Sequence, residues 1–316
     1  MNSIYNLLGI DDVSVLFLAP PAWGKTRMIL EMVKTYKGRV FYISPLRALS
    51  EEFRKNFRLG ELYSKGSKNF KIYINTAEKF LIDRHQIEVC KEDLLVIDEV
   101  HLFYLWEGFR EKLLEFREET LCVFNKALCL SATMTEDLKQ YYKKEFLLNF
   151  RDNIEIDLGN LTLKNYPEES YKLYKNRCFF TLLLLSRLKH GRVLLFVKYR
   201  SEVDEFLKLA RWFNIKALGC KGGQAYEFSK LSLGESEFFV STTVLSHGVN
   251  LPSINTVIIN YDLQDEVFFL QMISRAGRRG EKFQVYSMND ILKLKRRAIS
   301  LSQYGELIRC IPKLWC

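Results

Sequence analysis

The chain has 316 residues, with 47 Lys and Arg against 38 Asp and Glu, and 48% of its residues are hydrophobic. This length is typical of about two domains, and the formal net charge of +9 is compatible with a polyanionic partner. The longest apolar run, near Cys178 to Leu185, is too short to span a membrane. The seven cysteines show no spacing typical of zinc ligands, so we expect free thiols and a cytoplasmic protein.

Short apolar runs alternate with stretches of helical spacing in the first half of the chain. The apolar runs are VLFLAP (15–20), VFYISP (40–45), KIYINT (71–76), LLVIDE (94–99) and ALCLSAT (127–133), and the helical stretches include RMILEMVKTY (27–36) and EGFREKLLEFREE (107–119). This alternation is typical of βαβ units, so it predicts a parallel sheet with helices on its faces.

The pattern pauses after IEIDL (154–158) and then starts again. We interpret residues 159–176, with Pro167 near their middle, as a linker. The second cycle comprises a helix near 179–188, a strand at 192–197, a helix at 201–213 and strands at 237–243 and 256–261. We therefore expect two α/β domains, at 1–164 and 165–290, followed by a tail at 291–316.

The first apolar run leads into A-x-x-x-x-G-K-T, a pattern typical of a loop that binds nucleotide phosphates. In such a loop Lys25 contacts the β and γ phosphates, and the hydroxyl of Thr26 holds Mg²⁺. The following helix adds its positive N-terminal end. Because Ala19 replaces the usual glycine, an ordinary strand-to-helix turn is the alternative. The residues expected around the nucleotide are Ala19, Pro20, Pro21, Ala22, Trp23, Gly24, Lys25 and Thr26.

A second apolar run, LLVIDEVH (94–101), ends in two adjacent carboxylates. A buried parallel strand ends this way where a cation meets it, and magnesium bound to Thr26 is the natural candidate. We expect Asp98 to bind the metal and Glu99 to orient and deprotonate the attacking water. The alternative is a strand that simply runs out into solvent.

Further motifs follow these two in a fixed order. They are SPLRALSEEF (44–53), NTAEKF (75–80), LSAT (130–133), VLLFVKYRSEVDEF (193–206), STTVLSHGVNLPS (241–253) and QMISRAGRRG (271–280). With them the chain resembles a superfamily 2 helicase, and the GVNLP and Q-M-x-x-R-A-G-R strings favour its DExH branch, which contains archaeal repair helicases and exosome-associated RNA helicases, over DEAD-box RNA helicases. The resemblance implies two tandem RecA-like parallel-sheet domains with an ATP cleft between them.

The resemblance also assigns residues to roles. Arg275 and Arg278 match arginines that contact the γ-phosphate, with a solvated helix face as the alternative. Gly248 and Asn250 match positions near the nucleotide, Gln271 opens the last motif as a relay, and Ser131, Ala132 and Thr133 match the motif that couples hydrolysis to strand binding. The expected nucleic-acid contacts are Arg47, Thr76, Lys79, Lys198, Arg200 and Thr242, each with plain surface charge as the alternative. Both histidines within motifs, His101 and His247, are expected to couple or pack rather than bind metal.

Trp23 occupies a position that is usually small, so its indole either covers the nucleotide or packs under the loop. Residues 291–316 stand where larger relatives carry accessory domains, and they alternate apolar with basic residues as in an amphipathic helix pair. We expect this tail to cover the second domain, or to contact nucleic acid or a partner protein that replaces those domains.

The resemblance thus implies an ATP- and Mg²⁺-dependent helicase or translocase that acts on single-stranded or partly duplex DNA or RNA, with 3′ to 5′ movement. One alternative is an ATP-switched binding or remodelling protein that does not unwind by itself. Another is a motor that acts on protein, as preprotein translocation ATPases do with similar domains, and the lack of a large peptide-binding insertion argues against it.

Overall fold

The computed structural model describes residues 2–67, 69–173, 191–231, 233–246, 249–289 and 296–297. The chain divides into two compact units, residues 1–162 and 163–316. The division falls two residues before the boundary expected from the sequence. None of the helices in the described residues has the length and apolar content that crossing a membrane requires.

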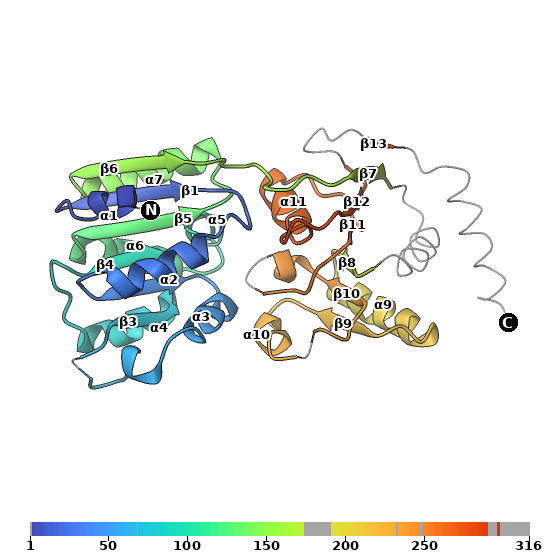
Figure 1. Ribbon diagram of the computed structural model, residues 1–316, viewed down its shortest axis with the longest axis horizontal. Helices are drawn as coiled ribbons and strands as arrows, with labels where there is room; N and C mark the ends of the chain where they lie inside the picture. Colours follow the sequence, from blue (N-terminus) through green and yellow to red (C-terminus); the bar gives the residue numbers. More distant parts are fainter. Residues whose placement is uncertain are drawn as a thin grey trace. The chain divides into compact units, whose positions relative to one another are not determined.

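The first unit is a parallel sheet with helices between its strands (Figure 1). Its strands are β1 (Val13–Leu18), β2 (Val40–Ser44), β3 (Ile72–Thr76), β4 (Leu94–Ile97), β5 (Lys126–Ser131) and β6 (Asp152–Asp157), in the order β3-β2-β4-β5-β1-β6. The helices are α1 (Asn2–Leu7), α2 (Lys25–Thr35), α3 (Arg47–Arg54), α4 (Ala77–Asp83), α5 (His101–Leu105), α6 (Lys112–Thr120) and α7 (Glu136–Asn149). The strand pairings recorded in this sheet are all parallel.

Both faces of this sheet are buried, because each inner strand is apolar on both sides. Along β1, Leu16 and Leu18 belong to one core cluster, whereas Val15 and Phe17 belong to the cluster on the opposite face. Side chains alternate between the two faces of a strand, so a continuous apolar run supplies both cores at once. This explains why the five apolar runs of the first half all form strands.

The second unit repeats this architecture. Its strands are β7 (Glu169–Lys172), β8 (Val193–Phe196), β9 (Ala217–Cys220), β10 (Phe238–Ser241), β11 (Thr256–Ile259), β12 (Gln284–Ser287) and β13 (Arg296–Arg297), in the order β13-β7-β12-β11-β8-β10-β9. The helices are α9 (Arg200–Trp212), α10 (Ala225–Phe228) and α11 (Glu266–Ile273). The recorded pairings are again parallel, and one core cluster joins β8, β10 and α9.

Three expectations on secondary structure need correction. The linker expected at 159–176 contains β7, which pairs with β12. Helix α6 begins at Lys112, so the first residues of the predicted helical stretch, 107–111, precede it. In the tail, expected as a helix pair, Arg296–Arg297 is a strand paired with β7. The rest of the tail and the helix expected at 179–188 lie outside the described residues.

Strand β7 escaped the sequence analysis because only two of its four residues, Ser170 and Tyr171, are buried. The ring of Tyr171 stacks on that of Tyr286, its register partner on β12, with 4.7 Å between the centroids. A four-residue strand with one large buried side chain has no periodic pattern that could mark it.

Replacing Tyr171 with Ala should therefore destabilise the second unit by about 3 kcal/mol, because a buried aromatic side chain and its stacking partner are lost. Tyr166, which is 61% exposed in the segment just before β7, provides the control. Tyr166→Ala should change the free energy of unfolding by less than about 0.5 kcal/mol. Urea denaturation of both variants tests this, and equal effects would mean that β7 is not a packed strand.

Candidate functional site

Three neighbouring strands bring the predicted phosphate-site residues to one edge of the first sheet. Strand β5 lies between β4 and β1, and Leu18 at the end of β1 is in register with Ser131 at the end of β5. The N–H of Ala19 donates to the carbonyl of Ser131 at 3.1 Å, and the N–H of Val100 donates to that of Leu130 at 2.9 Å. The loop after each strand therefore starts at this shared edge, where parallel sheets bind ligands.

The loop between β1 and α2 has the backbone conformation of an anion-binding turn. Ala22 and Gly24 adopt positive φ angles of 61° and 111°, a region that only Gly enters without strain. Gly24 caps α2, whose first residues are Lys25 and Thr26. The Lys25 ammonium donates to the carbonyls of Ala19 at 2.7 Å and Pro20 at 3.3 Å, so it lies over the loop. Backbone N–H groups, the helix N-terminus and this cation together favour a phosphate.

Trp23 packs against the strand below the loop and keeps part of its surface open. Its ring meets that of Phe17 edge-on, with 5.2 Å between the centroids, and the residue is 38% exposed. Trp23 thus packs partly under the loop, which is one of the two alternatives raised by the sequence, and the rest of its side chain is exposed.

Asp98 is buried at the end of β4, with only 6% of its surface exposed. The hydroxyl of Tyr42 and the N–H of Glu99 donate to its two carboxylate oxygens. Burial, and then the neighbouring Glu99 carboxylate, raise the pKa of Asp98 to about 6, whereas Tyr42 and the Lys25 cation act in the opposite direction. Burial also raises the pKa of Tyr42, which keeps its hydroxyl a donor. A nearby cation would stabilise this carboxylate.

The residues around Asp98 fit magnesium better than a metal held by protein alone. Among the described residues, no cluster of three or more His, Cys, Asp or Glu could enclose a metal ion. Magnesium usually takes one or two protein oxygens and completes its shell with water and phosphate oxygens. The carboxylate of Asp98 and the hydroxyl of Thr26 carry oxygens of this kind.

His101 joins the end of β4 to the end of β5. The ring is fully buried, and its Nδ1 lies 2.9 Å from Ser131 Oγ and 3.5 Å from Glu99 Oε2. Its Nε2 lies 3.3 Å from Thr133 Oγ1. Glu99 itself has a positive φ of 50°. His101 thus contacts the expected base and two residues of the coupling motif, with the intervening Ala132 also buried.

The three strand-contact candidates of the first unit share one hollow. Arg47 begins α3 directly after β2, and Thr76 caps α4 at the end of β3. The hollow has a volume of about 580 Å³, and we call it the basic hollow; it is lined by Pro45, Arg47, Ser50, Glu51, Arg54, Asn75, Thr76, Glu78, Lys79, Ile82 and Arg110. Sequence reasoning missed Arg54 and Arg110. Arg54 was detectable, because it lies two helical turns after Arg47 on the same helix.

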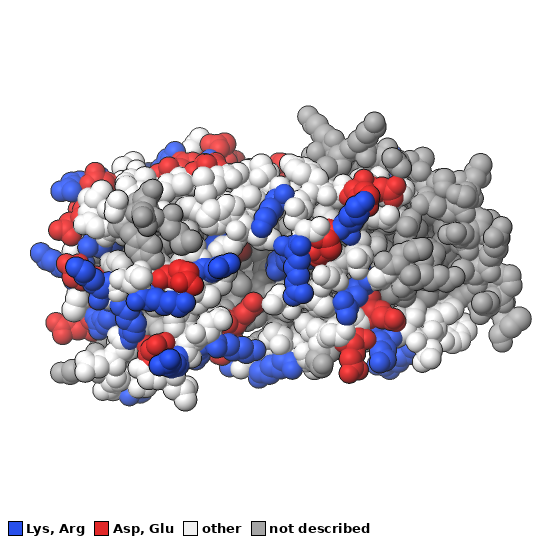
Figure 2. Space-filling view, in the orientation of Figure 1, with Lys and Arg blue, Asp and Glu red and all other residues white. Residues whose placement is uncertain are grey.

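The candidates of the second unit lie beyond the C-terminal ends of its strands. Lys198 follows β8, Arg200 begins α9, and Thr242 directly follows β10. The Arg200 guanidinium donates to the carbonyl of Gly222 at 3.0 Å, and Lys198 lies 5.5 Å from the centre of the Tyr199 ring. On the face drawn in Figure 2, Lys and Arg are interspersed with Asp and Glu, so net charge alone does not mark a binding surface.

The last motif has a buried and a partly exposed arginine. Arg275 is 5% exposed, and its guanidinium donates to the carbonyls of Ser246 and, at 2.9 Å, of Val249. Arg278 is half-buried and donates to the carbonyl of Ser274. Gln271 is buried on α11, and Asn250 is exposed. Gly248 and His247 lie outside the described residues. Arg275 therefore holds the segment around the GVNLP motif, a contact that the sequence did not predict.

Comparisons with known proteins agree with this architecture. Residues 2–141 match the family described as DEAD/DEAH box helicase, and residues 174–280 match the family described as helicase conserved C-terminal domain. The chain therefore contains the core of a superfamily 2 helicase, with one of these domains in each unit. Both units have the RecA-like fold.

Individual relatives are ATP-dependent RNA helicases by name. The protein sub2 of Emericella nidulans is 32% identical over 193 residues, which are 57% of this chain and 43% of that protein. DEAD-box ATP-dependent RNA helicase 56 of Oryza sativa is 30% identical over 169 residues, 50% of this chain and 38% of that protein. A structure of S. cerevisiae Dbp5 bound to RNA and ADP BeF3 has a TM-score of 0.73 at 16% identity, covering 95% of this chain and 88% of that one. The chain spans less than half the length of these two sequence relatives.

These relatives correct the expected branch. The sequence analysis favoured DExH helicases over DEAD-box helicases, whereas the sequence matches are RNA helicases of the DEAD-box group. The tetrapeptide DEVH shares its two carboxylates, Asp98 and Glu99, with DEAD and differs in its fourth residue, His101, which contacts Ser131 and Thr133.

The contacts of Arg275 and Arg278 predict different effects on stability. Arg275→Ala should lower the free energy of unfolding by about 3 kcal/mol, because two carbonyls lose a buried charged donor. Arg278→Ala should cost less than about 1 kcal/mol, since that side chain is partly solvated. Thermal and urea denaturation of the pair measure this difference. An unchanged free energy of unfolding in Arg275→Ala would show that Arg275 does not hold the segment around the GVNLP motif.

Proposed function

We propose that the protein is an ATPase stimulated by single-stranded RNA and that it uses ATP to move along or separate nucleic-acid strands. The observation that carries this proposal is the shared edge of β1, β5 and β4, which brings together the loop at 19–24, the segment Ser131–Thr133, the buried Asp98 and the partly exposed Glu99. The matches to helicase domains and to RNA helicases support it.

Within this site each residue has a chemical task. The loop at 19–24, the N-terminus of α2 and Lys25 bind the phosphates. Thr26 and Asp98 would hold magnesium, which would neutralise phosphate charge. Glu99 accepts the proton of the attacking water. Its Oε2 makes no hydrogen bond within the described residues and lies 3.5 Å from His101 Nδ1, and we assign the role of base to this carboxylate.

His101 offers a route from strand binding to hydrolysis. It lies between Glu99 and the hydroxyls of Ser131 and Thr133, so a shift of the coupling motif changes the contact of Glu99 Oε2. We propose that strand binding adjusts the base through this ring. In the second unit, Arg278 is the transition-state cation of the proposal, Arg275 positions the segment that leads to Asn250 and Gly248, and Gln271 relays between sites.

The basic hollow is the proposed phosphate path of the strand. Its lining includes Arg47, Arg54, Lys79 and Arg110 against Glu51 and Glu78, so its charge favours a polyanion. The second unit adds Lys198, Arg200 and Thr242. The names of the relatives favour RNA, and DNA is the comparison substrate. Movement from 3′ to 5′, cytoplasmic location and a protein partner are further proposals.

Variants of the nucleotide site test the activity itself. Lys25→Ala should weaken nucleotide binding, whereas Glu99→Gln should keep binding and lose turnover, because the water loses its base. The measurements are nucleotide affinity and ATP hydrolysis with RNA, with DNA and without a strand. Full turnover by Glu99→Gln, with binding intact, would exclude the assigned base.

The strand path predicts a change in salt dependence. Lys79→Ala should weaken RNA binding several-fold and reduce the slope of log affinity against log salt by about 0.7, the value for one phosphate contact on a single strand. Lys34→Ala is the matched control, since Lys34 is likewise paired with a carboxylate on its own helix. Equal slopes for the two variants would place the strand elsewhere.

The alternative function, an ATP-switched binding protein, predicts ATP-dependent strand affinity without unwinding. Duplexes with a 3′ or a 5′ overhang distinguish it. Separation of the 3′-overhang duplex alone supports directed movement from 3′ to 5′, and separation of neither duplex supports the alternative.

A further inference from the structure

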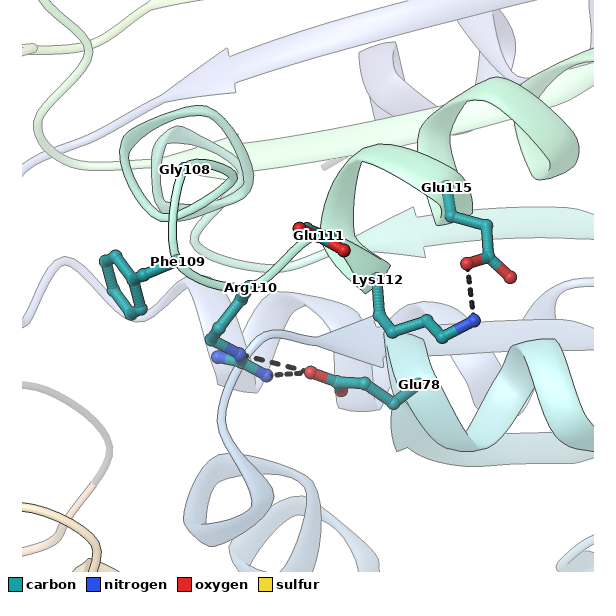
Figure 3. A pocket seen from close by; sticks show the side chains of 7 residues that line it. All are labelled: Glu78, Gly108, Phe109, Arg110, Glu111, Lys112 and Glu115. Atoms are coloured by element: carbon teal, nitrogen blue, oxygen red, sulfur yellow. Dashed lines mark hydrogen bonds and ion pairs between the residues drawn. The ribbon is translucent and has the colours of Figure 1, made fainter.

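A second hollow adjoins the basic hollow in the first unit. It has a volume of about 440 Å³, and Glu78, Phe109, Arg110, Glu111, Lys112 and Glu115 are among its lining residues (Figure 3). We call it the carboxylate hollow. Glu78 and Arg110 line both hollows, so they form the boundary between them.

The charges of the two hollows differ in sign. The basic hollow has more cations than carboxylates, whereas the carboxylate hollow has three glutamates against Arg110 and Lys112. Arg110 is paired with Glu78 and Lys112 with Glu115, as Figure 3 shows, so the third glutamate, Glu111, gives this hollow a net negative charge. The carboxylate hollow therefore disfavours a phosphate, and its oxygens accept hydrogen bonds from N–H groups.

An exposed aromatic ring stands on the loop that lines the carboxylate hollow. Phe109 is 69% exposed, and it lines the hollow together with charged side chains. Its ring centroid lies 5.9 Å from that of Trp106, which packs against the core of the unit. Figure 3 shows Phe109 and Arg110 leaving the same short loop in different directions.

Arg110 fixes this loop on the basic hollow. Its guanidinium donates to the carbonyl of Pro45 at 2.7 Å and to the carboxylate of Glu78 at 3.1 Å, and it lies 5.5 Å from the centre of the Trp106 ring. Pro45 directly precedes the Leu46–Arg47 segment that begins α3, and Glu78 lies in the first turn of α4. The loop that presents Phe109 is thus tied to both helices that flank the basic hollow.

We propose that Phe109 is a base-stacking platform for the single strand whose phosphates occupy the basic hollow. This inference rests on the proposed function. The strand's phosphates contact the cationic side, and one base turns across the Glu78–Arg110 boundary to stack on the Phe109 ring. Stacking tolerates any base because each base has a π-face, and nearby carboxylate oxygens additionally favour bases with exocyclic amino groups. The ring is exposed because its partner is the nucleic acid.

The first test compares strand affinities. Binding of a fluorescein-labelled oligocytidylate is measured by anisotropy, with a non-hydrolysable ATP analogue present. Phe109→Ala should raise the dissociation constant about 5- to 160-fold, the range for loss of one stacked base. Phe109→Tyr should bind like the original protein because it keeps the ring. Leu148→Ala is the control, since Leu148 is 82% exposed on α7 and does not line either hollow.

The second test locates the stacked base. A set of oligocytidylates, each with one abasic site, is bound to the original protein and to Phe109→Ala. One abasic position should weaken binding to the original protein and leave the affinity of Phe109→Ala unchanged, because both changes remove the same contact. A merely structural role for Phe109 would instead lower the affinity for every oligonucleotide equally.

The outcomes separate this inference from the function on which it rests. If the protein binds the strand and Phe109→Ala binds equally well, the stacking platform is refuted and the proposed function stands. If the original protein binds neither RNA nor DNA single strands, the proposed function fails first. A uniform loss across all abasic positions, together with a lowered melting temperature of Phe109→Ala, also overturns the platform.

Discussion

The nucleotide site depends on an incompletely neutralised pair of carboxylates at the end of β4. Asp98 is buried beside Glu99, and the two negative charges oppose each other in a place with little water. Tyr42, a backbone N–H and Lys25 offset part of this cost, yet the pKa of Asp98 is still raised. The protein alone therefore leaves a deficit of positive charge there. In the proposed function, a divalent cation that binds with the phosphates would supply it, and nucleotide binding would then stabilise the site.

In the proposed function, the strand order of the parallel sheet links the carboxylates to the neighbouring end of β5. Because β5 lies between β1 and β4, the coupling motif at its end lies between the phosphate loop and the carboxylates. His101 connects the two groups directly, since its ring contacts Glu99 and the hydroxyls of Ser131 and Thr133. Ser131 ends β5, whereas Glu99 and His101 follow β4 and Thr133 follows β5, so these contacts join the segments that leave the two strands.

The sequence predicted the parts of the molecule in which local pattern and environment agree. Apolar runs ending in polar residues gave the strands and their functional edge, because a strand buried on both faces has to be apolar throughout. Strand β7 was missed because its burial comes from one stacked tyrosine pair rather than from a pattern. Arg110 was missed because nothing local reveals that its guanidinium reaches Pro45 and Glu78, which are 65 and 32 residues away.

The arginines show that a sequence motif predicts where a residue lies better than it predicts what its side chain contacts. Arg275 and Arg278 belong to one motif and lie three residues apart, but the buried one donates to carbonyls of its own unit, while the other is partly solvated. A guanidinium is a rigid fork, so donors directed at backbone carbonyls cannot also face a phosphate. At the walls of the basic hollow, Arg54 donates to the carbonyl of Ile74 and the amide oxygen of Asn75. Arg110 donates to the carbonyl of Pro45 and pairs with Glu78. Burial separates only Arg275 from these arginines, since Arg54, Arg110 and Arg278 are all partly exposed, so the role of each follows from its contacts.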